Sequence, residues 1–205
     1  MTNVVSHAFS RVRPLIGFIP TDRCGKHEVK KRVDLLLSFI DLSNKVVLDL
    51  GCGDGRYEDE LIHYDCKLYC LDVDKEAVRR AKKNCPHIVL AACEFLPFVD
   101  RPFDLILVND VLEHVGDDKL VMTELYRCVK ENGHIEISVP NRLFPFEVHG
   151  IPSRTDVPVP LINYLPDIVR NRLVPHSRAY SAKSISQLLK NVHMKIVCWQ
   201  YIFPE

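Results

Sequence analysis

Three glycines stand at alternate positions directly after a short apolar run. The run covers residues 46–50, and Gly51, Gly53 and Gly55 follow it. Glycine adopts positive φ and lets a ligand approach the backbone closely. Residues 56–64 then begin a helix whose first N–H groups point back at the loop. This order of strand, glycine turn and helix predicts a nucleotide-type binding cradle, and a plain tight turn is the alternative.

A carboxylate at the end of the next strand indicates which kind of ligand the glycine loop binds. Asp72 closes a second apolar run, residues 67–71. At the end of a strand beside the glycine loop, a carboxylate accepts hydrogen bonds from both hydroxyls of a ribose. A helix cap is the alternative role, but Asp74 is better placed for it. The pair of motifs therefore predicts a ligand that carries a ribose.

The elements that position these residues alternate between strand and helix. The strands are too apolar for a sheet with one solvated face, so we expect an α/β fold: one domain over residues 1–205, with a doubly wound, mostly parallel sheet and helices on both faces. Further polar residues, among them Asn109 and Asp110, follow later strands and should meet the glycine loop at one edge of the sheet. The expected strands are 46–50, 67–71, 87–92, 103–108, 134–139 and 195–203, and the expected helices are 27–40, 74–83, 117–129 and 181–192.

Two segments stand outside this alternation. Residues 1–25 are irregular but apolar, which predicts a packed N-terminal arm or a lid over the site. Residues 141–180 interrupt the pattern after a strand end and are rich in proline. A long insertion at this place usually serves function. We expect a substrate cap here, with a padding excursion as the alternative.

Composition limits the class of protein. Lys+Arg and Asp+Glu both number 27, so the formal net charge is zero, which argues against nucleic acid as the main partner. No apolar run approaches the roughly 18 residues of a membrane helix, and no leader pattern opens the chain. The eight cysteines include no CxxC pair and are expected to be reduced, buried thiols of an intracellular, cytoplasmic protein. The sequence makes no prediction of an oligomeric state.

These motifs, taken in order, resemble those of the class I S-adenosylmethionine-dependent methyltransferases, close to the type 11 group of mostly small-molecule enzymes. Residues 46–55 are similar to the first motif and residues 70–74 to the second. Residues 96–98 with 103–114 resemble the third and fourth motifs. The resemblance covers about residues 28–140, and residues 181–203 more loosely. It implies a Rossmann-like methyltransferase fold and S-adenosylmethionine as cofactor.

The resemblance also implies roles for individual residues. Asp72 would bind the ribose, Val73 the adenine face, and Cys93 with Glu94 the adenine edge. Asn109 and Asp110 would line the floor near the methyl group. The methionine end would lie against Asp49, Gly51, Cys52 and Gly53.

Two competing functions remain open at this level. A dehydrogenase also has a glycine loop and an acid after the second strand, but Asp54 is poorly suited beside a pyrophosphate. S-adenosylmethionine has no phosphate and carries two cationic groups, which acids favour. An inactive cofactor-binding scaffold subunit is the other alternative. Its motivation is Ala92, which stands where the family has an acid, and a chain end that leaves no sequence for the family's last antiparallel strand.

Methyl transfer needs alignment, a dry pocket and sometimes a base. The candidate bases are His114, Glu147 and His149. Asp110, Glu113 and His114 also resemble a magnesium motif of some relatives, but we expect no metal. The favoured acceptor is a hydroxylated small molecule or lipid-like compound, with N-methylation as the alternative.

Overall fold

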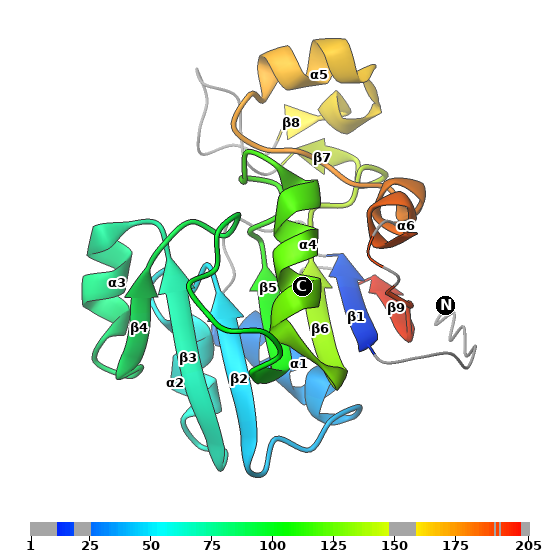
Figure 1. Cartoon of the computed structure of the whole chain (residues 1–205). Helices are drawn as coiled ribbons and strands as arrows, with labels where there is room; N and C mark the ends of the chain where they lie inside the picture. The colour runs from blue at the N-terminus through cyan, green and yellow to red at the C-terminus, as the bar shows by residue number, and fades with distance from the viewer. Residues whose placement is uncertain (1–11, 19–25, 148–158, 191, 193, 202–205) are drawn as a thin grey trace.

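The computed structural model describes residues 12–18, 26–147, 159–190, 192 and 194–201. A seven-stranded sheet in the order β4-β3-β2-β5-β6-β1-β9 forms its centre (Figure 1). Every neighbouring pair in this sheet runs parallel. The strands are β1 Val12–Phe18, β2 Lys45–Leu50, β3 Cys66–Asp72, β4 His87–Leu90, β5 Phe103–Asn109, β6 Val129–Ser138 and β9 Cys198–Tyr201.

Helices cover both faces of the sheet, which confirms the predicted doubly wound α/β fold. In Figure 1, α4 and α6 lie on the near face, and α1 and α2 lie behind the sheet. No helix in the described part of the chain is long and apolar enough to cross a membrane. The helices are α1 Lys26–Leu37, α2 Arg56–Leu61, α3 Lys75–Ala81, α4 Asp118–Cys128 and α6 Ala182–Lys190.

The core has two layers because successive side chains of a strand point to opposite faces. Leu48 of β2 joins the cluster under α4 and α6, together with Leu125 and Leu189. Val47, its neighbour, joins the second cluster with Val33 of α1. Burial of both faces is the reason for the nearly unbroken apolar runs in the sequence.

The expectation of an irregular N-terminal arm is wrong for residues 12–18. They form β1, which runs parallel between β6 and β9. Pro14 and Gly17 weigh against a strand on local propensity. Without β1, the edges of β6 and β9 that face each other would carry unpaired N–H and C=O groups. β1 pairs with both edges, and these backbone hydrogen bonds outweigh the low strand propensity. β1 thus occupies the position between β6 and β9 in the sheet. The rest of the predicted arm, residues 1–11 and 19–25, lies outside the described residues.

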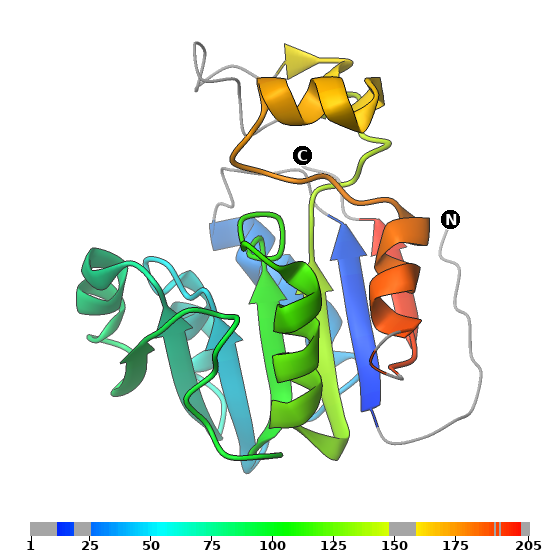
Figure 2. The same ribbon diagram turned by 45° about the horizontal axis from the view of Figure 1, so that its top comes forward.

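Residues 141–180 include a small lobe beyond the carboxyl ends of the strands, which we call the cap (Figure 2). It contains β7 Phe146–Glu147, β8 Val159–Pro160, the 3-10 helix η1 Ile162–Tyr164 and α5 Asp167–Leu173. Arg170 is its buried centre: Nη2 donates to Glu147 Oε2 at 2.6 Å, and Nε to Asn163 Oδ1 at 3.2 Å. The cap is therefore an ordered unit with a polar core.

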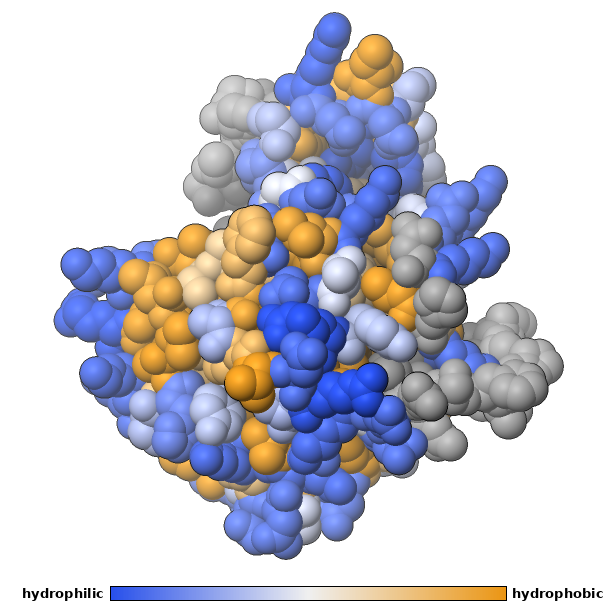
Figure 3. All heavy atoms as spheres, in the orientation of Figure 1, coloured by the Kyte–Doolittle hydropathy of each residue, from blue (hydrophilic) through white to orange (hydrophobic). Residues whose placement is uncertain are grey.

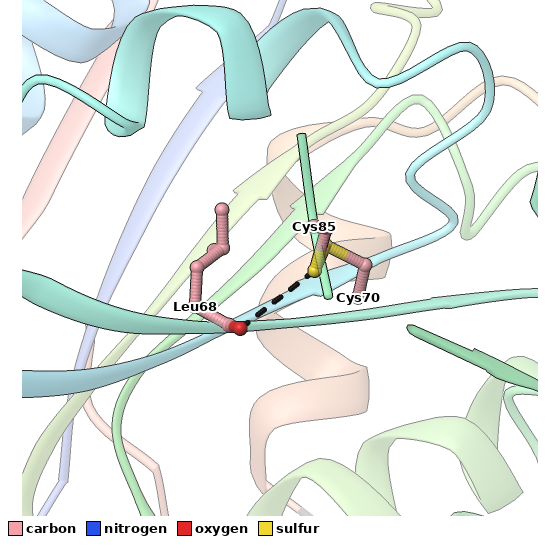
Figure 4. The surroundings of a disulfide bond; sticks show 3 residues. All are labelled: Leu68, Cys70 and Cys85. Atoms are coloured by element: carbon pink, nitrogen blue, oxygen red, sulfur yellow. Dashed lines mark hydrogen bonds between the residues drawn. A yellow bond between two sulfur atoms is a disulfide. The ribbon is translucent and has the colours of Figure 1, made fainter. Parts of the chain in front are cut away.

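A disulfide links Cys70 of β3 to Cys85, which follows α3 (Figure 4). Figure 4 also shows the Cys85 sulfur directed at the Leu68 carbonyl, 3.7 Å away. The prediction of reduced thiols is wrong for this pair. The two cysteines are 15 positions apart, and only the return of the chain after α3 brings them together. Cys52 of the glycine loop belongs to the same buried cluster.

Candidate active site

A cavity of about 390 Å³ opens at the carboxyl ends of β2, β3 and β5. Most of the predicted site residues meet there, as expected for polar residues at the ends of parallel strands. Those that line the cavity are Asp49, Gly51, Cys52, Gly53, Asp72, Asn109, Asp110 and His114.

The glycine loop is shaped by positive φ angles, which are 75° at Gly51 and 54° at Gly53. The two positions differ in their surroundings. A Cβ on Gly51 would lie 2.3 Å from Cγ2 of Val111, which packs against the loop from the end of β5. A Cβ on Gly53 would meet nothing within 4 Å, because this residue faces the cavity. Gly53 thus leaves a cradle into which a ligand fits against the backbone.

This difference separates the effects of two alanine substitutions. Gly51→Ala should destabilise the protein by about 2–4 kcal/mol, because left-handed strain adds to the clash with Val111. Gly53→Ala should cost only about 1 kcal/mol but weaken cofactor binding roughly tenfold, because its methyl group enters the cradle. Urea unfolding and calorimetry of each variant measure both effects. Equal losses of stability would contradict this account of the loop.

Asp72 holds the loop in place and faces the cavity. Its Oδ2 accepts from the Gly53 N–H at 2.8 Å, and its Oδ1 accepts from the Asp74 N–H at 2.8 Å. A carboxylate offers about four lone-pair sites, so each oxygen keeps one for a hydroxyl group. The geometry therefore fits the predicted ribose contact.

Asp49 is buried at the base of the cavity. Burial, and then the carboxyl of Glu58 on α2, raise its pKa well above the usual range. Among the described residues, its Oδ2 has no hydrogen-bond partner. An orphaned, buried carboxyl oxygen at the cavity wall fits a cationic ligand group, such as the α-ammonium of S-adenosylmethionine.

Arg32, a buried arginine under the cavity floor, was not among the site residues predicted from the sequence. Nη1 of Arg32 on α1 donates to Asp110 Oδ2 at 3.0 Å, to Asn109 Oδ1 at 3.2 Å and to Tyr57 Oη at 3.1 Å. It fixes the side chain of Asn109, which ends β5, and that of Asp110, which follows the strand and has a φ of 55°. Arg32 lies on the apolar face of α1 between Val29 and Leu36. A charged residue on the apolar face of a helix is the feature of the sequence that could have identified it as a buried cation.

Glu136 of β6 is the second buried charge that was missed. Burial raises its pKa to about 8, and the neighbouring Arg32 guanidinium opposes this rise. A carboxylate in the middle of an apolar strand was its only signal in the sequence. It lies behind the cavity rather than in its wall, in the small void beside Arg32 and Asn109.

Among the candidate bases that the structure describes, His114 is the one that lines the cavity. Its Nδ1 lies 2.8 Å from the carbonyl oxygen of His176, in the segment that returns from the cap. A carbonyl only accepts, so Nδ1 carries the hydrogen, and the lone pair of the neutral ring is on Nε2. Arg178 of the same segment donates to the carbonyls of Val115 and Gly116 and holds this loop.

Of the remaining candidate bases, those that the structure describes do not line the cavity. Glu147 is buried in its ion pair with Arg170, which is a structural position inside the cap. His149 lies outside the described residues. Over the described ranges, no group of three or more His, Cys, Asp or Glu residues is arranged to hold a metal ion. Asp110, the first residue of the magnesium-like motif, is paired with Arg32 instead.

The predicted adenine contacts also lie outside the wall of the cavity. Val73 is exposed, and burial raises the pKa of the Cys93 thiol to about 12. Glu94 Oε1 accepts from the Gly116 N–H at 2.8 Å, so this carboxylate ties two loops together. Figure 3 shows an apolar surface over β4 and the loop after it, where Phe95 is exposed.

The parallel sheet, with a glycine loop and a carboxylate at adjacent strand ends, defines the Rossmann-like class of α/β proteins. Residues 48–137 match the family model described as a methyltransferase domain. The YcgJ protein from Bacillus subtilis has the same fold: the TM-score is 0.61 at 20% identity, over 80% of this chain and 68% of that chain. Residues 48–137 of this chain are therefore similar to a methyltransferase domain, within a fold of the Rossmann-like class.

Three curated proteins are similar to part of this chain. An uncharacterised protein of Methanocaldococcus jannaschii is 34% identical over 46% of this chain and 44% of its own. A malonyl-acyl-carrier-protein O-methyltransferase of Hamiltonella defensa is 31% identical over 48% of this chain and 39% of its own. A Mycobacterium tuberculosis protein named "probable S-adenosylmethionine-dependent methyltransferase" is 27% identical over 47% of this chain and 36% of its own. The family and these names imply S-adenosylmethionine as cofactor, and the chain spans less than half the length of these relatives.

Proposed function

We propose that this protein transfers a methyl group from S-adenosylmethionine to a hydroxyl group of a small-molecule or lipid-like acceptor. The observation that carries the proposal is the cavity at the strand ends. Its wall combines the open cradle at Gly53, the Asp72 carboxylate and the orphaned oxygen of Asp49. A pyrophosphate would meet carboxylates on two sides, whereas a ligand with a ribose and cationic groups meets complementary charge.

The ribose, the α-ammonium and the reacting centre of the cofactor each have a matching part of the wall. Asp72 would hold the ribose, and Asp49 would face the α-ammonium. Asn109 and Asp110, fixed by Arg32, would form the floor near the reacting centre. The exposed Val73 would cover the adenine. Bound S-adenosylmethionine supplies a methyl group on a positively charged sulfur.

His114 supports a hydroxyl group as the accepting atom. An alcohol must lose its proton as it attacks, and a positioned imidazole takes up such a proton. The hydrogen bond of Nδ1 to His176 leaves Nε2 as the basic nitrogen of the neutral ring. The O-methyltransferase relative from Hamiltonella defensa points in the same direction, although it shares only part of its length with this chain.

The cap supports an acceptor that is partly apolar. Leu161, Tyr164 and Ile168 expose apolar surface on it. The described part of the cap contributes no residue to the cavity wall, but its returning segment contacts His114. We therefore place the acceptor between the cap and the cavity, next to His114.

Replacing His114 tests the proposed base. His114→Gln should lower methyl transfer to a hydroxylated acceptor by about 10²–10⁴-fold, because the glutamine side chain takes up no proton. Its affinity for the cofactor should stay within about twofold. The assay measures S-adenosylhomocysteine released with a panel of phenols, hydroxylated fatty acids and primary amines. Turnover of amines alone would favour N-methylation, and cofactor binding without turnover of any acceptor would favour the scaffold alternative.

A further inference from the structure

Two buried carboxyl groups meet beneath the glycine loop. Asp49 of β2 is 1% exposed, and Glu58 of α2 is 0% exposed. Outside this pair, no N–H or O–H donor among the described residues bonds to Asp49 Oδ2 or to either carboxyl oxygen of Glu58, and the two carboxyls are each other's side-chain hydrogen-bond partner. Two neighbouring carboxylates without donors cannot both stay ionised in a buried site at low cost.

The other titratable groups near the pair do not lower the cost of ionising both carboxyls. Glu136 of β6 and Asp72 of β3 act on Asp49, and Asp59 and Asp72 act on Glu58, each as a further carboxyl group that raises the pKa. Arg32 of α1 acts on Glu136. Of the two buried carboxyls, Asp49 lines the cavity, whereas Glu58 lies behind the loop, with Oε2 3.4 Å from the position of a Cβ on Gly55.

We propose that Asp49 and Glu58 share one proton in the cofactor-free protein, and that the α-ammonium of S-adenosylmethionine displaces this proton when it binds beside Asp49. The inference rests on the proposed function, because it assumes that cofactor. The balance is simple: one proton leaves the carboxyl pair for the solvent, and one positive charge takes its place. Burial favours this exchange, because a buried pair of carboxylates needs a positive charge beside it. Either the shared proton or the ammonium group of the ligand supplies that charge. Glu58 acts through Asp49 and is a positioning residue.

The wild-type protein tests the exchange without any substitution. Titration calorimetry in buffers of different ionisation enthalpy counts the protons released per ligand bound. At about pH 6.5 the α-amino group of the ligand is already charged, since its ordinary pKa is about 7.7–8.0. We expect S-adenosylmethionine and S-adenosylhomocysteine each to release about half to one proton. Methylthioadenosine lacks the ammonium-bearing part, so its binding should release almost none.

Two matched variants assign the proton to the pair. Glu58→Gln replaces the acid beside Asp49 by an amide that can donate a hydrogen bond to it. This favours an ionised Asp49 before binding although the site stays buried, so the release should fall at least about threefold. Glu136→Gln removes a buried carboxyl that lies behind the cavity and acts less strongly on Asp49 than Glu58 does, so the release should fall clearly less than in Glu58→Gln. The methylthioadenosine comparison remains decisive if a variant does not fold.

Three outcomes would overturn the proposal: equal release with methylthioadenosine, undiminished release from Glu58→Gln, or a larger loss of release in Glu136→Gln than in Glu58→Gln. Binding of S-adenosylmethionine with no proton release would overturn this inference alone and leave the proposed function intact. Failure of S-adenosylmethionine to bind would overturn the proposed function, and this inference with it.

Discussion

Asp72→Ala is expected to weaken S-adenosylmethionine binding by at least about tenfold, or about 1.4 kcal/mol. Hydrogen bonds to a charged partner contribute about 1.5–3 kcal/mol each, and the proposed ribose contact uses both carboxyl oxygens. The substitution also removes the acceptors for the Gly53 and Asp74 N–H groups, so the cradle loses its support. Titration calorimetry with S-adenosylmethionine and S-adenosylhomocysteine measures the loss.

Two controls separate ribose binding from loop support. Asp72→Asn keeps one acceptor oxygen and should lose less affinity than Asp72→Ala. Glu76→Ala, on the exposed side of α3, removes a carboxylate that pairs only with Arg79 among the contacts resolved, and should bind normally. An Asp72→Ala variant with wild-type affinity would mean that the cofactor site lies elsewhere.

The second large effect is expected in the cap. Arg170→Met should destabilise it by about 3–5 kcal/mol, because the Glu147 carboxylate is left buried without its cation. The guanidinium also donates to the Ser177 carbonyl at 2.7 Å and to Asn163, so one substitution disconnects several segments of the cap. Hydrogen exchange at β7 and α5 should speed up. Cofactor affinity should stay within about twofold, because the described cap residues do not line the cavity.

The double variant Glu147→Leu with Arg170→Met is the matched control. Replacing both partners of a buried ion pair by apolar groups is often neutral, so protection of the cap should largely return. If the cap binds the acceptor, the single variant should lose methyl transfer while it still binds the cofactor. Wild-type exchange rates in Arg170→Met would show that the ion pair does not hold the cap together.

Some features could be predicted from the sequence because they depend on short stretches of chain. The glycine loop, the acid at the end of the next strand and the runs of apolar residues are local patterns, and the parallel sheet follows from them. The same patterns placed Asp49, Gly53 and Asp72 at one edge of the sheet, where the cavity lies. His114 was predicted for the same reason, since it follows the central strand β5.

The tertiary structure decided whatever depends on residues far apart in the chain. β1 became a strand because β6 and β9 offered it partners, against the local signals of Pro14 and Gly17. Arg32 reached Asp110 across 78 positions, and Glu147 was committed to Arg170 rather than to chemistry. The sequence by itself determined which residue types meet at the strand ends. Only the packed structure decided which of them are already bonded and which, like Asp49, keep an oxygen for a ligand, because that depends on which partners folding brings within hydrogen-bond distance.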